Sequence, residues 1–138
     1  CAKVMKEKGR GHIINIASQA SKLATPKSAV YAATKFAVRG YSNSFRLELR
    51  KHGIAVTTVN PGPIKTDFFD KADPKGSYLS RLGRWVLDPV AVAERIAESM
   101  LTNRREINLP WAMELGARFY VLFPRLGDVL ISSMFDLK

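Results

Sequence analysis

Two short runs of β-branched and apolar residues are separated by a long stretch with the residue spacing of a helix. The runs are His12-Ile-Ile-Asn-Ile-Ala17 and Ile54-Ala-Val-Thr-Thr-Val59, and both have the composition of buried strands. Strands joined by a long helix within one sheet pair in parallel, because the helix returns the chain to the same end of the sheet. This alternation constrains the chain to the α/β class.

The stretch between the two runs predicts the longest helix, over about residues 28–51. Its apolar and small residues recur at helical spacing, at Val30, Ala33, Ala37, Tyr41, Ser44 and Phe45. Basic residues fall in the last turn and Gly53 follows, which is typical of a helix end. Residues 2–8 predict the last turns of an earlier helix, closed by Gly9 and Gly11.

Prolines mark the ends and starts of several predicted elements in the second half of the chain. Asn60-Pro61-Gly62-Pro63 is expected to end the second strand, because proline cannot donate a hydrogen bond to a neighbouring strand. Residues 65–87 show no sustained period, which indicates a loop with short helical pieces. Asp88 and Pro89 suit the N-cap and the first position of a helix that runs to about Leu101.

The last predicted elements belong, with those before them, to a single domain over residues 1–138. The helix after Pro89 is expected to bury its apolar residues Val92, Ile96 and Met100. Glu106-Ile-Asn-Leu109 predicts a brief third strand, and residues 111–135 predict an amphipathic helical segment broken near Pro124. The whole order indicates a doubly wound parallel sheet of about three strands with flanking helices.

The formal net charge of +10 suggests a polyanionic partner, because clustered Lys and Arg bind phosphate. The basic residues are scattered, however, and no aromatic residues interleave with them as on a base-stacking surface. We therefore expect no nucleic-acid binding. The apolar stretch at 119–123 is far shorter than the roughly 18 residues of a transmembrane helix. An amphipathic C-terminal helix lying on a membrane surface stays an alternative, although only Arg118 and Arg125 accompany it.

Cysteine and histidine usage points away from disulfides and metals. Cys1 is the only cysteine, so an internal disulfide is impossible and a zinc site is not expected. A reducing, cytoplasmic setting fits this usage. His12 and His52 have no spaced partners, so both are expected to be structural. The chain starts neither with Met nor with an apolar signal core, and residue 1 is therefore expected to be a cut.

Tyr31 and Lys35 lie four residues apart on the long predicted helix, so their side chains share one face. An ammonium beside a phenol favours the phenolate, which brings a tyrosine closer to useful acid–base strength near neutral pH. The alternative is a solvated surface pair, because Tyr-x-x-x-Lys also occurs by chance on exposed helices.

Ser18 and the Pro61-Gly62 pair follow the two strands at their predicted carboxyl ends, where open α/β sheets bind ligands. The Ser18 hydroxyl could stabilise charge that develops on a substrate oxygen, although a lone serine in a loop can also be a cap. Gly62 would allow the backbone to approach a flat ligand closely, although an ordinary loop would contain the same residues.

Taken together, three segments resemble the second half of the short-chain dehydrogenases/reductases in order and spacing. They are Ile14-Asn15-Ile16-Ala17-Ser18, Tyr31-Ala-Ala-Thr-Lys35 and Asn60-Pro61-Gly62-Pro63-Ile64-Lys65-Thr66. The resemblance covers nearly the whole chain. It implies a partial Rossmann-like domain, the C-terminal part of a larger sheet, in an oxidoreductase that uses NAD or NADP to interconvert a carbonyl and an alcohol.

The resemblance also implies roles for single residues. Ser18 would orient the substrate carbonyl, Tyr31 would exchange the proton, and Lys35 would favour ionisation of the tyrosine while holding the nicotinamide ribose. The residues expected to contact the nicotinamide end are Pro61, Gly62, Ile64 and Thr66. The cofactor itself carries the hydride chemistry. The region 65–87 would form a lid over a small-molecule substrate.

Three parts of the family pattern are missing from the sequence. No Gly-x-x-x-Gly-x-Gly loop occurs for the cofactor phosphates, and the Asn-Asn-Ala-Gly-like segment and the helix Asn of the family's proton relay are absent too. All three are expected before Cys1, so the chain alone is expected to be inactive. The rival interpretation is a non-catalytic α/β fragment whose unpaired sheet edge recruits a partner. The open edge predicts a homo-oligomer or a swapped dimer.

Aromatic residues of the second half have two interpretations. They could line a site for an apolar substrate, since the same region covers the active site in the resembling family, or they could pack in the core or an oligomer. The residues concerned are Phe68, Phe69, Tyr78, Trp85 and 119–123.

Overall fold

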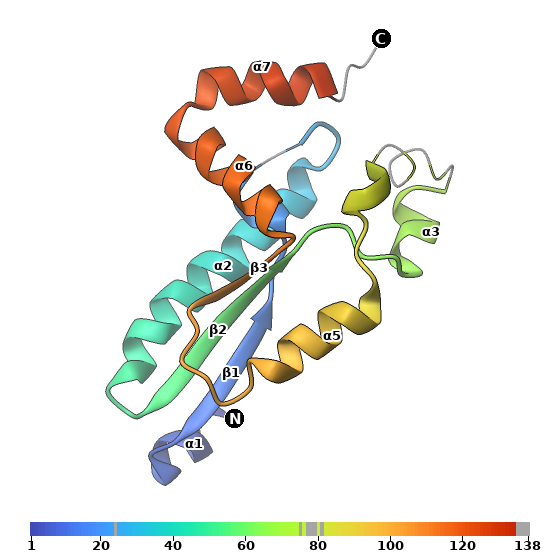
Figure 1. Ribbon diagram of the computed structural model, residues 1–138. Coiled ribbons are helices and arrows are strands. Elements are labelled where there is room, and N and C mark those ends of the chain that lie inside the picture. Colours follow the sequence, from blue (N-terminus) through green and yellow to red (C-terminus); the bar gives the residue numbers. More distant parts are fainter. Residues whose placement is uncertain (24, 75, 77–79, 81, 135–138) are drawn as a thin grey trace.

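The computed structural model describes residues 1–23, 25–74, 76, 80 and 82–134, and Figure 1 shows its course. Within this part of the chain, three strands form one parallel sheet in the order β1 (Gly11–Ile16), β2 (Ile54–Pro61) and β3 (Glu106–Leu109). The helical elements are α1 (Ala2–Lys8), η1 (Gln19–Ser21), α2 (Ala29–Arg50), α3 (Phe68–Ala72), η2 (Gly83–Trp85), α5 (Pro89–Glu98), α6 (Trp111–Leu122) and α7 (Pro124–Met134). The predicted α/β class and its parallel pairing are confirmed.

The core lies where α2 packs against the central strand β2. Leu49, Ile54 and Val56 form its buried centre, and Phe45 and Ile13 pack against them. β1 is only half-buried, although its composition predicted a buried strand. β1 is the outer strand of the sheet, and α2 packs mainly on β2 rather than over β1.

Two glycines predicted to end helices meet at one end of the sheet. Gly9 closes α1 with φ of 63°, and Gly53 follows α2 with φ of 68°. A Cβ atom at Gly53 would lie 2.5 Å from the carbonyl oxygen of Gly9, so a larger residue would clash there. The helix ends are therefore set both by backbone conformation and by this close approach.

The long helix α2 lies as predicted, but a different face of it is buried. Ala32, Ser42 and Leu49 are the buried residues. The residues whose spacing predicted the helix lie mainly on the outside, with Val30 81% and Tyr41 57% exposed. A helix with apolar residues on two faces leaves the choice of buried face to the sheet it packs on.

β2 continues through Asn60 and Pro61, two residues beyond the predicted end. Residues 58 and 62 donate their backbone N–H groups toward β3, whereas the Val59 carbonyl accepts from Ala17 on the β1 side. A backbone N–H at residue 61 would point toward the β1 side, as the backbone groups of Val59 do, but β1 ends at Ile16. No carbonyl of β1 therefore loses a hydrogen-bond donor because residue 61 is a proline.

The second half follows the predicted order of elements. Asp88 caps α5 by accepting a hydrogen bond from Ala91 N at 2.9 Å, and Val92 is buried as expected. Met100 is 58% exposed, contrary to the prediction, because α5 ends at Glu98 and the chain turns away. No helix among the described residues is both long enough and apolar enough to span a membrane.

Candidate functional site

A cleft of about 840 Å³ opens where β1 and β2 end. Its walls come from the loops after these strands, the first turns of α2, the helix α3, and the C-terminal pair α6 and α7 (Figure 1). All seven residues nominated from the sequence line it: Ser18, Tyr31, Lys35, Pro61, Gly62, Ile64 and Thr66. Three segments that are far apart in the sequence thus meet in one cavity.

Ser18 is both a cap and a residue of the cleft. Its extended backbone precedes η1, and its Oγ accepts a hydrogen bond from Ala20 N at 3.1 Å. The same hydroxyl donates to the Pro61 carbonyl at 3.4 Å, which is long for an O–H···O bond. The hydroxyl can therefore turn to a shorter acceptor in the cleft at little cost.

Tyr31 and Lys35 lie on one face of α2, one turn apart. The Lys35 Nζ is 5.7 Å from the centroid of the Tyr31 ring, within the range of a cation–π contact. It donates one hydrogen bond, to the Ile16 carbonyl at 3.3 Å. An ammonium has three donors, so among the described residues Lys35 keeps two for another molecule. The Tyr31 side chain is 39% exposed and has no hydrogen-bond partner in the described chain.

Gly62 is a glycine for a reason that the sequence did not suggest. A Cβ there would lie 2.9 Å from Met113 Sδ and 3.1 Å from Pro110 Cδ, while the Gly62 N–H donates to the Leu109 carbonyl at 2.6 Å. The missing side chain lets the end of β2 pack against the start of α6. This packing is a second reason for the glycine, and the close approach to a ligand expected from the sequence stays a prediction.

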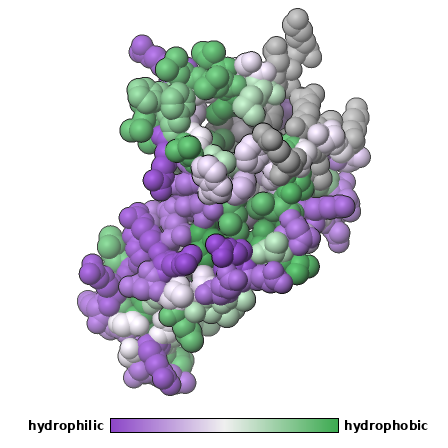
Figure 2. Space-filling view, in the orientation of Figure 1, coloured by the Kyte–Doolittle hydropathy of each residue, from purple (hydrophilic) through white to green (hydrophobic). Residues whose placement is uncertain are grey.

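The wall opposite Ser18 and Tyr31 is largely apolar. Among the predicted aromatic residues, those that line the cleft are Phe68, Phe69, Phe119 and Tyr120. Trp85 lies outside this lining, and Tyr78 falls outside the described residues. Figure 2 shows hydrophobic side chains gathered over α6 and α7, whereas hydrophilic ones dominate the opposite end of the molecule.

The elbow between α6 and α7 is closed by one tyrosine. The Tyr120 hydroxyl donates to Asp128 Oδ1 at 3.0 Å, and this hydrogen bond raises the pKa of Tyr120. Its ring lies against Gly127, where a Cβ would come within 2.3 Å of Tyr120 Cδ2. The apolar wall of the cleft is therefore held at a fixed bend.

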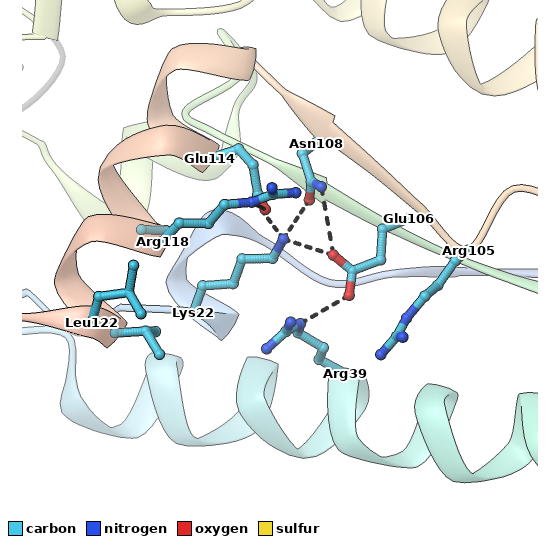
Figure 3. Close-up of a pocket in the computed structure, with 10 residues that line it drawn as sticks. Lys22, Arg39, Arg105, Glu106, Asn108, Glu114, Arg118 and Leu122 are labelled. Atoms are coloured by element: carbon cyan, nitrogen blue, oxygen red, sulfur yellow. Dashed lines mark hydrogen bonds and ion pairs between the residues drawn. The ribbon is translucent and has the colours of Figure 1, made fainter.

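A second polar cluster, which the sequence did not predict, lies on the other side of α6. Lys22, Glu106, Asn108 and Glu114 join η1, β3 and α6, and Figure 3 shows their side chains converging. Lys22 is separated along the chain by 84 residues from Glu106, by 86 from Asn108 and by 92 from Glu114. No local spacing in the sequence could have connected them.

His12 has the structural role expected of it. Its Nδ1 accepts a hydrogen bond from Leu101 N at 3.0 Å, so Nε2 carries the proton and donates to Thr57 Oγ1 at 2.8 Å. Burial lowers the pKa of His12. Within the described part of the chain, no group of three His, Cys, Asp or Glu side chains could hold a metal ion.

Comparisons with known proteins show which family this chain is similar to. A family model described as short chain dehydrogenase matches residues 1–76. A 3-alpha-(or 20-beta)-hydroxysteroid dehydrogenase of Mycobacterium bovis is 44% identical over 94 residues, which cover 68% of this chain and 35% of that protein. The chain spans less than half the length of the curated relatives it matches.

Solved structures share the fold. A gluconate 5-dehydrogenase from Burkholderia cenocepacia J2315, crystallised with NADP and tartrate, is similar with a TM-score of 0.65 and 29% identity, over 78% of this chain and 46% of that one. A short-chain dehydrogenase from Streptomyces avermitilis has a TM-score of 0.69 over 97% of this chain and 54% of its own. At 20% identity the second likeness shows the fold alone.

Proposed function

Because this chain belongs to the short-chain dehydrogenase family, we propose that it forms the proton-handling part of an NAD(P)-dependent oxidoreductase acting on a carbonyl or alcohol. The observation that carries the proposal is the convergence of Ser18, Tyr31 and Lys35 in one cleft with the Pro61-Gly62 turn. Each of these residues has a side chain or backbone group suited to a different part of the reaction.

Tyr31 is proposed to exchange the proton with the substrate oxygen. Its hydroxyl has no partner in the described chain, and the Lys35 ammonium lies beside its ring. A phenol hydroxyl without a partner can donate its proton to a bound substrate oxygen, and the nearby positive charge stabilises negative charge that develops on the phenol oxygen. Ser18 donates its hydroxyl hydrogen to the same substrate oxygen in place of its long bond to Pro61.

The cleft suits a nicotinamide cofactor on two observations. Lys35 keeps two unused donors, which match the neighbouring hydroxyl groups of a ribose. Ile64 and Thr66 line the same cavity beside Pro61, where a flat ring would lie next to Ser18 and Tyr31. When bound, the nicotinamide supplies or accepts the hydride, while these residues bind and orient.

The substrate is proposed to be a carbonyl or alcohol with an apolar body. Phe119, Met113 and Leu130 face the cleft from the C-terminal helices, and Phe68 lies 5.9 Å from the Tyr31 ring, between ring centroids. An apolar wall stabilises an apolar ligand by removing its surface from water. The hydroxysteroid dehydrogenase, 44% identical over 94 residues, supports a substrate of this kind.

A further proposed property is self-association. Besides the open edge of β1, the outer face of α2 exposes Val30, Tyr41 and Leu47, the last at 67%. Exposed strand edges and large apolar patches recruit partners. Sedimentation of the isolated chain should therefore show a dimer or higher species, and a single folded monomer would contradict the proposal.

The experiment that tests the proposed function uses the full-length protein containing this chain. Loss of the reduced-cofactor absorbance is followed with a panel of apolar ketones, and Tyr31→Phe should lower kcat by about 10²–10⁴. Tyr41→Phe is the matched control, because Tyr41 lies on the same helix outside the cleft. Equal rates for the native protein and Tyr31→Phe would remove Tyr31 from the mechanism.

A further inference from the structure

Lys22 is buried, and polar acceptors surround its ammonium group. Its side chain is 5% exposed, and its Nζ donates to Glu106 Oε2 at 2.7 Å, to Asn108 Oδ1 at 2.8 Å and to Glu114 Oε2. Figure 3 shows the ammonium between these three acceptors. All three donors are used, so Lys22 has none left for a ligand.

The two carboxylates around Lys22 each have an arginine of their own. Arg39 Nε donates to Glu106 Oε1 at 3.2 Å, and Arg118 Nε donates to Glu114 Oε1 at 2.9 Å. Removal of Lys22 would thus leave two paired carboxylates rather than two unpaired ones. The cluster can lose its central cation without leaving an uncompensated negative charge.

The cluster continues through Asn108 to the end of β2. Asn60, which is fully buried, donates its amide to Asn108 Oδ1 at 2.8 Å. Its side-chain oxygen accepts from Ser21 Oγ, and its carbonyl accepts from Gln19 Nε2, both at 3.1 Å. The segment directly after Ser18 is therefore held by Lys22 and Asn60 together.

The helix α6 is a wall shared by the cluster and the cleft. Glu114 and Ala117 line a cavity of about 660 Å³ beside the cluster, whereas Met113, Gly116 and Tyr120 line the cleft. The two sets alternate along the same helical turns, so a shift of α6 on one side moves the other side as well. Lys22 binds this helix directly through Glu114.

We propose that Lys22 is a positioning residue that ties the segment carrying Ser18 to both β3 and α6, and so sets where the Ser18 hydroxyl lies relative to the substrate wall. It does not touch the substrate and acts through Ser18 and α6. The inference rests on the proposed function, since Ser18 matters only if a substrate oxygen binds beside it.

The kinetic test is a double-mutant cycle in the full-length protein. Lys22→Met should lower kcat about tenfold in the native background, but less than about twofold in a Ser18→Ala background, where there is no hydroxyl left to position. Lys51→Met, an exposed lysine far from both sites, should leave kcat unchanged. Equal losses in the two backgrounds, or no loss in the native one, would overturn the proposal.

A second measurement does not depend on turnover. In Lys22→Met, backbone hydrogen exchange should rise at least about tenfold over residues 17–23 and in the first half of α6, while α5 stays unchanged. A uniform rise, or no local rise, contradicts the positioning role. If the native protein turns over no carbonyl compound while this local rise occurs, the proposed function fails and the structural role of Lys22 stands.

Glu114→Gln is the second variant in case Lys22→Met does not fold. It keeps an oxygen acceptor for Lys22 but removes the charge, so exchange should rise in α6 more than over residues 17–23. A loss in kcat of about threefold is expected, again absent in the Ser18→Ala background. An unchanged exchange pattern together with an unchanged kcat would show that the cluster does not hold α6.

Discussion

Lys22 and Lys35 lie on opposite sides of the end of β2, and the protein surrounds them in opposite ways. Lys22 is buried with three side-chain acceptors, whereas Lys35 lies at the cleft with one backbone acceptor at 3.3 Å. A lysine whose donors are all used can fix a structure, while a lysine with unused donors can bind a ligand. The number of acceptors within reach separates the two roles, and the sequence does not show it.

The greatest expected difference between the two lysines is a loss of activity at Lys35. Lys35→Met in the full-length protein should lower kcat/KM by about 10²–10³, because the cleft loses its cation beside Tyr31. Its free energy of unfolding should change by less than about 0.5 kcal/mol. Steady-state kinetics and urea denaturation on one preparation check both numbers. An inactive variant that is also strongly destabilised would make Lys35 structural as well.

The reverse pattern is expected at Lys22. Lys22→Met should lower the free energy of unfolding by about 2–3 kcal/mol, less than the 3–5 typical of a broken buried pair, because Glu106 and Glu114 keep their arginines. Urea denaturation measures this difference. Lys51→Met is the exposed control and should stay within about 0.5 kcal/mol of the native protein. Equal stability of Lys22→Met and Lys51→Met would show that the contacts of Lys22 do not stabilise the fold.

A smaller effect tests whether the cleft side of α6 can be disturbed without touching Lys22. Gly127→Ala should destabilise the fold by about 1–2 kcal/mol and raise the KM for an apolar ketone, because its Cβ would displace the Tyr120 ring. Gly40→Ala is the control, since Gly40 lies on α2 outside the cleft and a Cβ there meets nothing within 4 Å. A KM for Gly127→Ala equal to that of the native protein would show that the elbow does not shape the substrate wall.

The smallest effect concerns pH. Burial alone would raise the pKa of Glu106, but the hydrogen bond and charge of Lys22, followed by those of Arg39, hold it below its ordinary value of 4.5. A carboxyl with a lowered pKa stabilises the fold at neutral pH and loses that contribution as the pH falls through the folded-state pKa.

The difference in unfolding free energy between the native protein and Lys22→Met should therefore be greatest near pH 7. It should shrink, by less than about 1 kcal/mol, as the pH falls below about 4. Denaturation curves at several pH values measure this change. A difference that stays constant or widens in acid would show that Lys22 does not hold Glu106 ionised.

Local signals in the sequence were sufficient for most elements. Asp88 and Pro89 marked the start of α5, Gly9 and Gly53 marked helix ends, and the strand at 106–109 lies where it was predicted. These features depend on a few neighbouring residues. The end of β2 was predicted wrongly, because whether Pro61 needs an N–H depends on where β1 stops, which is not a local property.

In the candidate site, too, residues with local signals were predicted and residues with distant partners were missed. Ser18, Tyr31 and Lys35 were nominated because strand ends and helical spacing place them at one edge of the sheet, and the cleft contains all three. Their roles stay predictions. Lys22 and Asn60 were missed, because their partners lie 39 or more positions away along the chain. The packing role of Gly62 was missed too, because Met113 belongs to a distant helix.

The bend between α6 and α7 has a consequence for how such a protein diverges. The apolar wall is carried by two terminal helices joined by the Tyr120–Asp128 contact, while Ser18 and Tyr31 lie on a loop and a helix earlier in the chain. Substitutions in the elbow can thus accumulate without altering the residues proposed to move the proton. Selection for a new substrate would act first on α6 and α7, and a library restricted to their cleft-facing positions is the economical place to redesign specificity.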